Sequence, residues 1–186
     1  MNVRLLGGIY FVLFVAAVWL GGTKNRFRFP EAGPDRLARY GIDLILALAA
    51  AAIVIFATRV LTRRVSAFRE MARLFREILG PLNREEIFLV SAFSAVAEEF
   101  FFRGFLQAVI GFVPTSVFFG LLHVGPGRKF IPWTLFAVTL GFALGGLYAW
   151  RGNLLAPVVM HFAINFGNLL AIQRPVPDPD QGAGSS

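Results

Sequence analysis

The chain contains several long runs of apolar residues with few or no charges, and these runs limit its fold more than any other feature. Two of them, residues 5–20 and 40–61, approach the length of about 20 residues that a helix needs to cross a bilayer. A segment in lipid must satisfy its own backbone polar groups, which favours helices. Mean hydropathy is +0.66, and charged residues make up only 16% of the chain. The sequence therefore predicts an all-α, polytopic transmembrane helix bundle.

Four further apolar segments follow the first two. Residues 83–110, 132–150 and 154–172 predict three more spans. Residues 114–123 are too short to span comfortably and predict a half-helix or a tilted helix buried among the others. We therefore expect about six membrane segments. The run at 5–20 also resembles a signal peptide, but no convincing small-x-small cleavage site follows it, so we interpret it as an uncleaved transmembrane helix.

Residues 62–79 have a different pattern, which predicts a basic amphipathic helix ending at Gly80-Pro81. Such a helix lies along a membrane surface, or alternatively binds an acidic partner. Apolar residues recur at spacings of three and four, opposite a row of arginines: Val65, Phe68, Ala72, Phe75 and Leu79 against Arg63, Arg64, Arg69, Arg73 and Arg76.

These segments divide the chain into three parts. Residues 1–82 hold two N-terminal transmembrane helices and the amphipathic helix, and residues 83–172 hold the remaining apolar segments. Asn83 and Glu86 have the spacing of a capping box, in which an N-cap side chain and a residue three positions later bond each other's backbone N–H groups. Residues 173–186 are rich in Pro, Gly and Ser, and we expect them to be disordered.

The distribution of charge indicates the partners and the location of the chain. The net charge is +7, but the basic residues gather between the apolar runs, which suits membrane topology and anionic headgroups better than nucleic acid. We expect a multi-pass protein of a bacterial inner membrane, with the basic loop at 59–84 in the cytoplasm. The chain has no cysteine, which excludes disulfides, thiolate metal sites and a cysteine nucleophile.

Three ionisable residues lie in the middle of the predicted third span, beyond the charged residues at its start: Glu98, Glu99 and Arg103. Each costs roughly 2.5 to 3.5 kcal/mol at the centre of a bilayer, so such residues are usually functional. Glu99 and Arg103 are four residues apart, so they share a helix face and can form an ion pair. Glu98 is turned about 100° away and stays available. A polar clasp between helices is the alternative interpretation, but a clasp needs no second glutamate.

Both histidines of the chain also lie in or beside apolar segments. His123 closes the short fourth segment, and His161 lies in the last one, with Asn165 one turn later on the same face. Polar groups in lipid converge on one another or on water. We therefore expect these side chains to meet the acidic pair in one cavity. Asp43, near the start of the second span, is a stray acid that we expect at the interface or paired with an arginine.

These residue types favour hydrolysis. A carboxylate and an imidazole around one water form a general base. A second imidazole and a carboxamide can donate hydrogen bonds to a developing oxyanion. Zinc held by Glu98, His123 and His161 is the alternative, but the sequence has no His-Glu-x-x-His motif. We favour metal-free chemistry with no cofactor.

Three motifs in order resemble the CPBP family of CAAX prenyl endopeptidases and bacteriocin-processing enzymes, also called Abi or type II CAAX proteases. They are Glu-Glu-x-x-x-Arg at 98–103, Phe-x-x-x-His at 119–123 and His-x-x-x-Asn at 161–165, and the resemblance covers roughly 83–172. The resemblance implies an intramembrane glutamic endopeptidase with residues 83–172 as its catalytic core. In the implied roles, Glu98 and His123 activate water, His161 and Asn165 stabilise the oxyanion, and Glu99 and Arg103 support the site.

The resemblance implies a membrane-anchored protein or peptide as substrate, such as a C-terminal sorting signal or a leader peptide. Nothing in the sequence marks prenylated proteins as the substrate or indicates an oligomeric state. A non-enzymatic immunity factor or membrane scaffold of the same fold is the alternative function. An ion or proton pathway would need polar residues at several depths, whereas here they gather near one place.

Overall fold

The computed structural model describes residues 3–22, 27–28, 33–125 and 127–173, and within these ranges the chain is helical, without strands. This arrangement confirms the predicted all-α bundle. The elements, in chain order, are α1 (Val3–Gly22), α2 (Arg36–Arg64), α3 (Ser66–Leu79), α4 (Arg84–Glu99), the π-helix η1 (Phe100–Leu106), α5 (Gln107–Ile110), α6 (Phe112–Leu121), the 3₁₀ turn η2 (Arg128–Phe130), α7 (Ile131–Arg151) and α8 (Leu155–Gln173).

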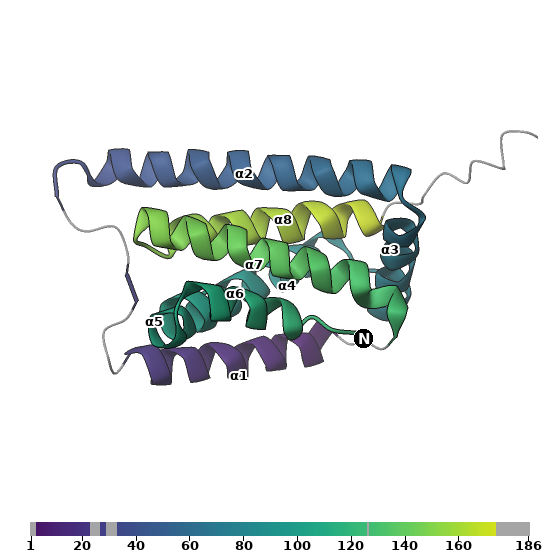
Figure 1. Cartoon of the computed structure of the whole chain (residues 1–186), viewed down its shortest axis with the longest axis horizontal. Helices are drawn as coiled ribbons and strands as arrows, with labels where there is room; N and C mark the ends of the chain where they lie inside the picture. The colour runs from purple at the N-terminus through teal and green to yellow at the C-terminus, as the bar shows by residue number, and fades with distance from the viewer. Residues whose placement is uncertain (1–2, 23–26, 29–32, 126, 174–186) are drawn as a thin grey trace, which may run out of the picture.

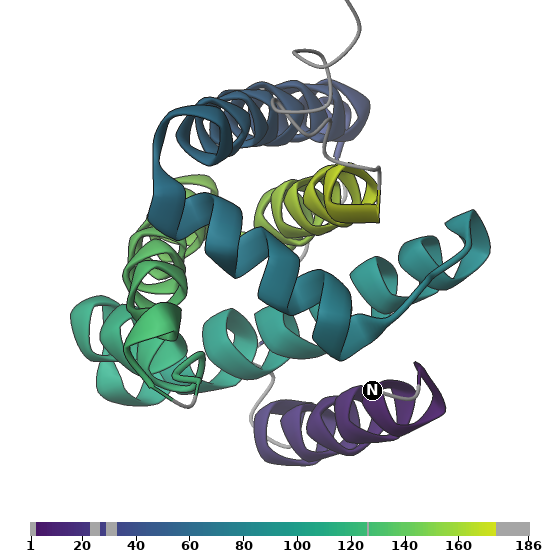
Figure 2. The ribbon, with the colours of Figure 1, turned by 90° about the vertical axis from the view of Figure 1, so that its right-hand side faces the viewer.

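The long helices lie roughly side by side, with α2 and α1 on opposite sides of the bundle (Figure 1). Helix α8 packs along α2 and α4, α6 packs along α7, and α1 covers α4 and η1. Helix α3 runs across one end of the bundle, where it contacts α2, α7 and α8 (Figure 2). The predicted amphipathic helix therefore closes one end of the space between the long helices.

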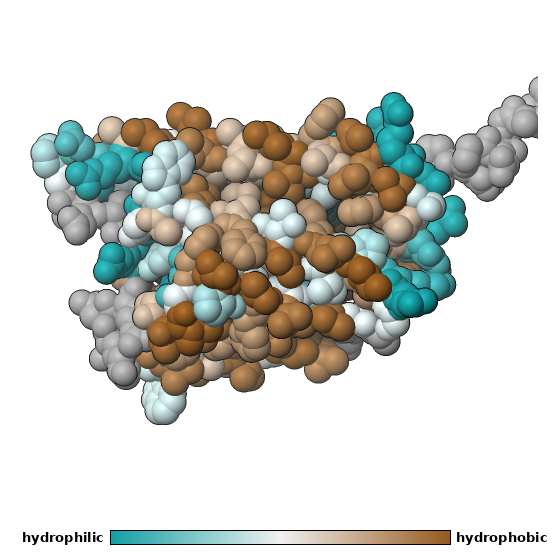
Figure 3. Space-filling view, in the orientation of Figure 1, coloured by the Kyte–Doolittle hydropathy of each residue, from teal (hydrophilic) through white to brown (hydrophobic). Residues whose placement is uncertain are grey.

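Among the described residues, four helices are long and apolar enough to cross a membrane: α1 from Leu5, α2, α7 together with η2, and α8. Large apolar side chains on them point outward, among them Phe11, Ile45 and Phe56. Figure 3 shows this apolar surface over the middle of the molecule and hydrophilic residues at its two ends, one of them around α3. An apolar belt between polar ends is the surface that a bilayer requires. The chain is a membrane protein.

The predicted third and fourth segments differ from plain spans. The helical path from Arg84 to Ile110 changes to a π-helix at Phe100, so no single α-helix covers it. Helix α6 begins at Phe112, before the predicted start at Pro114, because proline needs no N–H partner in a first turn. It ends at Leu121, so His123 follows the helix rather than closing it.

Local sequence signals position the ends of other elements. Asn83 and Glu86 form the predicted capping box, with both backbone-to-side-chain bonds at 2.9 Å. Gly80 has a φ of 69°, a conformation that suits glycine, and it ends α3 as expected. Helix α8 includes Gln173, one residue beyond the predicted core. The rest of the predicted tail, 174–186, lies outside the described residues.

Glycines let α6 and α7 approach closely, as small residues do in membrane bundles. A Cβ on Gly120 would lie 2.7 Å from the backbone N and Cα of Val138, and one on Gly141 would lie 2.6 Å from the carbonyl of Ser116. The two helices therefore touch backbone to backbone, which fixes the height of His123 relative to α7.

The stray acid Asp43 is fully buried in α2 and binds Arg151 at the end of α7. Its second oxygen accepts from Nδ2 of Asn153 at 2.9 Å, and Oδ1 of Asn153 accepts from the N–H of Leu155 at 2.9 Å. Asp43 pairs with an arginine, as expected, and connects α2 to the turn from which α8 starts.

Candidate active site

Glu99 and Arg103 form the ion pair that their spacing predicts, and both side chains are completely buried. Nε of Arg103 lies 3.2 Å from Oε2 of Glu99, and Nη1 donates to Oε1 at 3.3 Å. Nη2 donates to the carbonyl of Gly141 at 3.0 Å, and the guanidinium lies over the ring of Phe119, 4.7 Å from its centre. Arg103 therefore connects η1 to α6 and α7 while it neutralises Glu99.

His161 completes this buried group from α8. Its Nδ1 lies 2.8 Å from Oε1 of Glu99. An ionised carboxylate only accepts hydrogen bonds, so we assign the proton of the neutral ring to Nδ1. Nε2 of His161 is then an acceptor, and it becomes a donor only when the ring is protonated. Glu99 thus orients His161 as well as Arg103.

His123 is oriented by the end of α6. The N–H of His123 bonds to Gly120, which leaves the carbonyl of Phe119 without its usual helical partner. Nδ1 of His123 lies 2.6 Å from that carbonyl, and a carbonyl can only accept, so Nδ1 carries the proton. Nε2 faces Glu98, 3.8 Å from Oε2. The Phe-x-x-x-His spacing therefore directs a basic nitrogen toward the free glutamate.

Glu98 has a different environment from Glu99. Its residue is 6% exposed, and Oε2 is buried without a hydrogen-bond partner among the described residues. The 3.8 Å separation from Nε2 of His123 is too long for a direct hydrogen bond. Of the adjacent glutamates, one is committed to two partners and the other keeps a free carboxylate oxygen, as the sequence predicts.

Asn165 lies one turn beyond His161 on α8. Its Nδ2 donates to Oγ of Ser94 at 2.9 Å, and Oγ of Ser94 donates to the carbonyl of Ser91 at 3.1 Å. A carboxamide nitrogen has two N–H groups, so one remains for another acceptor. Ser94 and Glu98 are four residues apart, which places the support of Asn165 and the free carboxylate on one face of α4.

One cavity of about 1090 Å³ brings the free groups together. Its lining includes Glu98, His123, His161 and Asn165, while Glu99 and Arg103 are not part of the lining. The structure thus separates the six residues into four that line the cavity and two that lie outside its lining. Their catalytic roles remain predictions.

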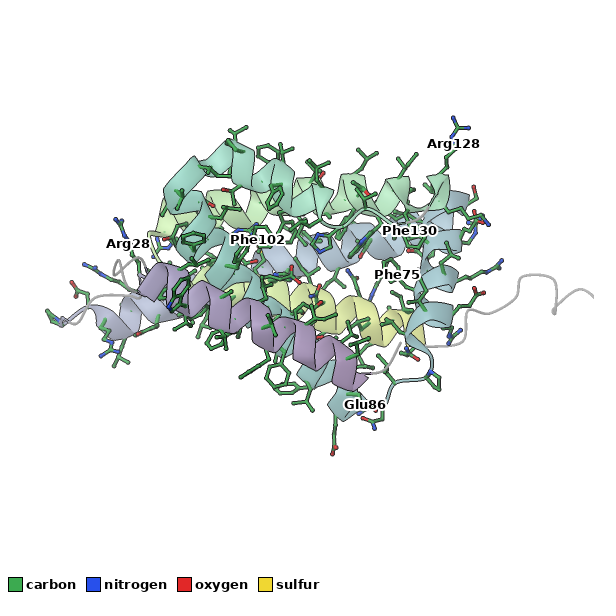
Figure 4. The ribbon with its side chains drawn as sticks, turned by 90° about the horizontal axis from the view of Figure 1, so that it is seen from below. Arg28, Phe75, Glu86, Phe102, Arg128 and Phe130 are labelled. Atoms are coloured by element: carbon green, nitrogen blue, oxygen red, sulfur yellow. The ribbon has the colours of Figure 1, made fainter. Side chains whose placement is uncertain are left out.

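Aromatic rings form the wall of this cavity on the side of α3. The ring of Trp133 lies 5.5 Å from His123 and 4.8 Å from Phe75, measured between centroids. Figure 4 shows Phe75 and Phe130 on the inner side of α3, and Phe102 near the middle of the bundle. Helix α3 is therefore in contact, through Trp133, with the ring that faces Glu98.

Sequence reasoning missed Tyr10 and Ser94, which also line the cavity. Tyr10 belongs to α1, lines the cavity beside Glu98 and interacts electrostatically with that carboxylate. It is the only hydroxyl-bearing side chain in the sequence of α1, and this was the available signal. For Ser94, the signal was its position one helical turn before Glu98.

A zinc site needs three convergent ligands. Within the described parts of the chain, no group of three His, Cys, Asp or Glu residues is placed to hold a metal ion. Glu98, His123 and His161 line a shared cavity, but they do not form such a group.

Comparison with known proteins agrees with the motifs. A family model described as type II CAAX prenyl endopeptidase, Rce1-like, matches residues 85–167. A Bacillus subtilis (strain 168) protein described as uncharacterized protein YpbD is 36% identical over 92 residues, which cover 48% of this chain and 47% of that protein. The match thus spans about half the length of this relative. No solved structure matches the chain.

The family model covers α4 through most of α8, the segment that carries all six predicted site residues. Residues 85–167 are therefore similar to the Rce1-like type II CAAX prenyl endopeptidases, which are a family of peptide hydrolases.

Proposed function

We propose that this protein is a multi-pass intramembrane endopeptidase that hydrolyses a peptide bond of a membrane-anchored protein or peptide with a water activated by Glu98 and His123. The observation that carries the proposal is the free, buried oxygen of Glu98 beside Nε2 of His123 in the large cavity. Polar groups separated by more than about 3.5 Å are commonly bridged by water. A water between Glu98 and His123 would donate one hydrogen bond to each.

In the proposed reaction, Glu98 removes a proton from this water. At the same time the oxygen of the water attacks the carbonyl carbon of the substrate. The carbonyl oxygen becomes an oxyanion and accepts from the second N–H of Asn165 and from Nε2 of His161 in its protonated form. Glu98 then returns the proton to the leaving nitrogen as the C–N bond breaks. Water is consumed, and one carboxyl and one amino terminus form.

Glu99 and Arg103 support this chemistry without touching the substrate. Both are fully buried, and Glu99 bonds Nδ1 of His161. A carboxylate on Nδ1 orients the ring and stabilises the imidazolium that must donate to the oxyanion. The reaction as proposed needs no metal, and zinc held by Glu98, His123 and His161 is the alternative that a chelator tests.

We place the protein in a bacterial inner membrane, with α3 at the cytoplasmic surface. The basic residues of α3 and of the end of α2 support this orientation through the preference of Lys and Arg for the cytoplasmic side. The substrate we propose is a C-terminal sorting signal or a leader peptide. Bacteriocin immunity without catalysis is the weaker candidate, because it gives the free glutamate no role.

The test is expression of the wild type, Glu98→Gln and Glu85→Gln in the same host with candidate membrane-anchored substrates from its genome. Glu85 is the control because it lies on the same helix and is exposed. Peptide mapping of membrane fractions should show new termini with the wild type and Glu85→Gln, but not with Glu98→Gln. Identical fragments from all three would refute the proposal.

A further inference from the structure

Five arginines line the same cavity as the four free polar groups. They come from the last turns of α2 and from the face of α3 that is turned toward the bundle: Arg59, Arg63, Arg69, Arg73 and Arg76. Among the described residues that line the cavity, Glu98 is the only acidic one. The cavity therefore has a strongly positive wall at its α3 end, opposite a single carboxylate.

These arginines have no acidic partner within the described residues. Arg69 and Arg76 donate to backbone carbonyls, those of Arg63 and Gln173, at 2.9 and 2.7 Å. The other basic residues with described ion pairs behave differently: Lys129, for example, binds Glu70 at 2.7 Å. The five lining arginines thus keep guanidinium groups available for an anion.

The two acidic residues of α3 are turned away from the cavity. Glu70 and Glu77 are exposed and do not line it, whereas Arg69, Arg73 and Arg76, three and four positions apart, do. Glu70 and Glu77 lie three residues before and four residues after Arg73, where a helix allows pairing, but Glu70 binds Lys129 and neither glutamate forms an ion pair with Arg73 within the described residues. The positive charge of α3 is therefore directed into the cavity rather than only toward the membrane surface.

We propose, building on the proposed function, that the substrate is a peptide segment carrying carboxylate groups, which this arginine cluster binds while the scissile bond lies at Glu98. Arginine forms paired, charge-assisted hydrogen bonds with carboxylates, and a partly enclosed wall strengthens them. The carboxylates belong either to acidic side chains or to a free C-terminus. The arginine cluster selects the substrate and holds it close to α3.

A lipid headgroup is the competing anion. Comparing an arginine that lines the cavity with one outside it distinguishes a bound peptide from a lipid headgroup. Arg63 lines the cavity, and its neighbour Arg64, also exposed, does not. Headgroups at the membrane surface attract both, whereas a peptide inside the cavity meets only Arg63. Arg73 and Arg84 give a second comparison, because both are exposed and only Arg73 lines the cavity.

The test measures binding without catalysis. The Glu98→Gln protein is placed in nanodiscs of phosphatidylcholine, and the probes are short palmitoylated fluorescent peptides containing several glutamates or, in their place, glutamines. Each probe is made with a free and with an amidated C-terminus, which separates the two sources of carboxylate. The glutamate probe or the free C-terminus should bind about tenfold more tightly than the fully neutral probe.

In that background, Arg63→Gln with Arg73→Gln should abolish the preference, and the control Arg64→Gln with Arg84→Gln should retain it. Equal affinity for all probes, or the same loss in both double variants, would overturn the proposal. A lipid experiment could also overturn the proposal. In mixed nanodiscs, native mass spectrometry counts the phosphatidylserine molecules that the protein retains. If this retention depends on Arg63 and Arg73 while no peptide probe is preferred, the ligand is a lipid.

Cleavage by the wild type separates this inference from the proposed function. If the glutamate probe is bound preferentially but no probe is cut, the hydrolase proposal fails and the recognition of carboxylates stands. If the neutral probe is cut as fast as the acidic one, the hydrolase proposal stands and the inference fails.

Discussion

Replacing Arg103 with methionine removes the only cation that neutralises Glu99 within the described structure. Both side chains are completely buried, so the variant leaves an uncompensated charge in the bundle and also loses the bond to the carbonyl of Gly141. Breaking a buried pair in this way costs about 3 to 5 kcal/mol. For a chain of this size, that corresponds to a fall in unfolding temperature of about 6 to 20 °C.

The assay is thermal unfolding of the purified protein in detergent, followed by circular dichroism. The double variant Glu99→Gln with Arg103→Met is the matched control, because it leaves no buried charge while the side-chain carbonyl of the introduced glutamine still accepts from His161. It should recover at least half of the lost stability. An Arg103→Met protein as stable as the wild type, or a double variant no better than the single one, would refute the reasoning.

Three other substitutions test the packing, the helix cap and the site. Gly120→Ala should lower the free energy of unfolding by about 1 to 3 kcal/mol, because its methyl would lie 2.7 Å from the backbone of Val138. The control Gly41→Ala should leave the free energy of unfolding unchanged, because a methyl there meets nothing within 4 Å. Asn83→Ala should cost about 1 kcal/mol in the same unfolding assay without slowing peptide cleavage. Tyr10→Phe should lower kcat roughly tenfold or more while unfolding stays unchanged, since it removes the hydroxyl that interacts with the Glu98 carboxylate.

The sequence was sufficient to predict the membrane helices and the different environments of Glu98 and Glu99. Apolar runs near 20 residues specify membrane helices because lipid permits few alternatives. The four-residue spacing of Glu99 and Arg103 predicts their pairing because the helix fixes which residues share a face. The same reasoning left Glu98 available, and in the structure its Oε2 is free.

Other features depended on tertiary contacts that no local pattern encodes. The bond of His161 to Glu99 joins residues 62 positions apart, so spacing alone paired His161 with Asn165 and not with the ion pair. The π-helix after Glu99 could not be predicted, because the sequence of residues 100–106 has no feature that distinguishes a π-helix from an α-helix. Tyr10 reaches Glu98 only because α1 packs against α4.

The position of α3 shows the same limit. Its amphipathic pattern predicted a helix on the membrane surface with its arginines toward water or a partner. The pattern does not say which neighbour each face meets, and in the structure several arginines line the cavity beside the candidate catalytic groups. Hydrophobic periodicity identifies the faces of a helix, and only the packing assigns them.

The most direct test of the central claim is the rate of peptide cleavage by purified, chelator-treated protein in nanodiscs, with its metal content measured in the same sample. The substrate is one identified by the expression experiment. The wild type and Glu85→Gln should cleave it at equal rates without bound metal, and Glu98→Gln should be slower by about 100-fold or more, as expected for loss of a general base. Full activity of Glu98→Gln, or a rate that follows the zinc content, would contradict the account.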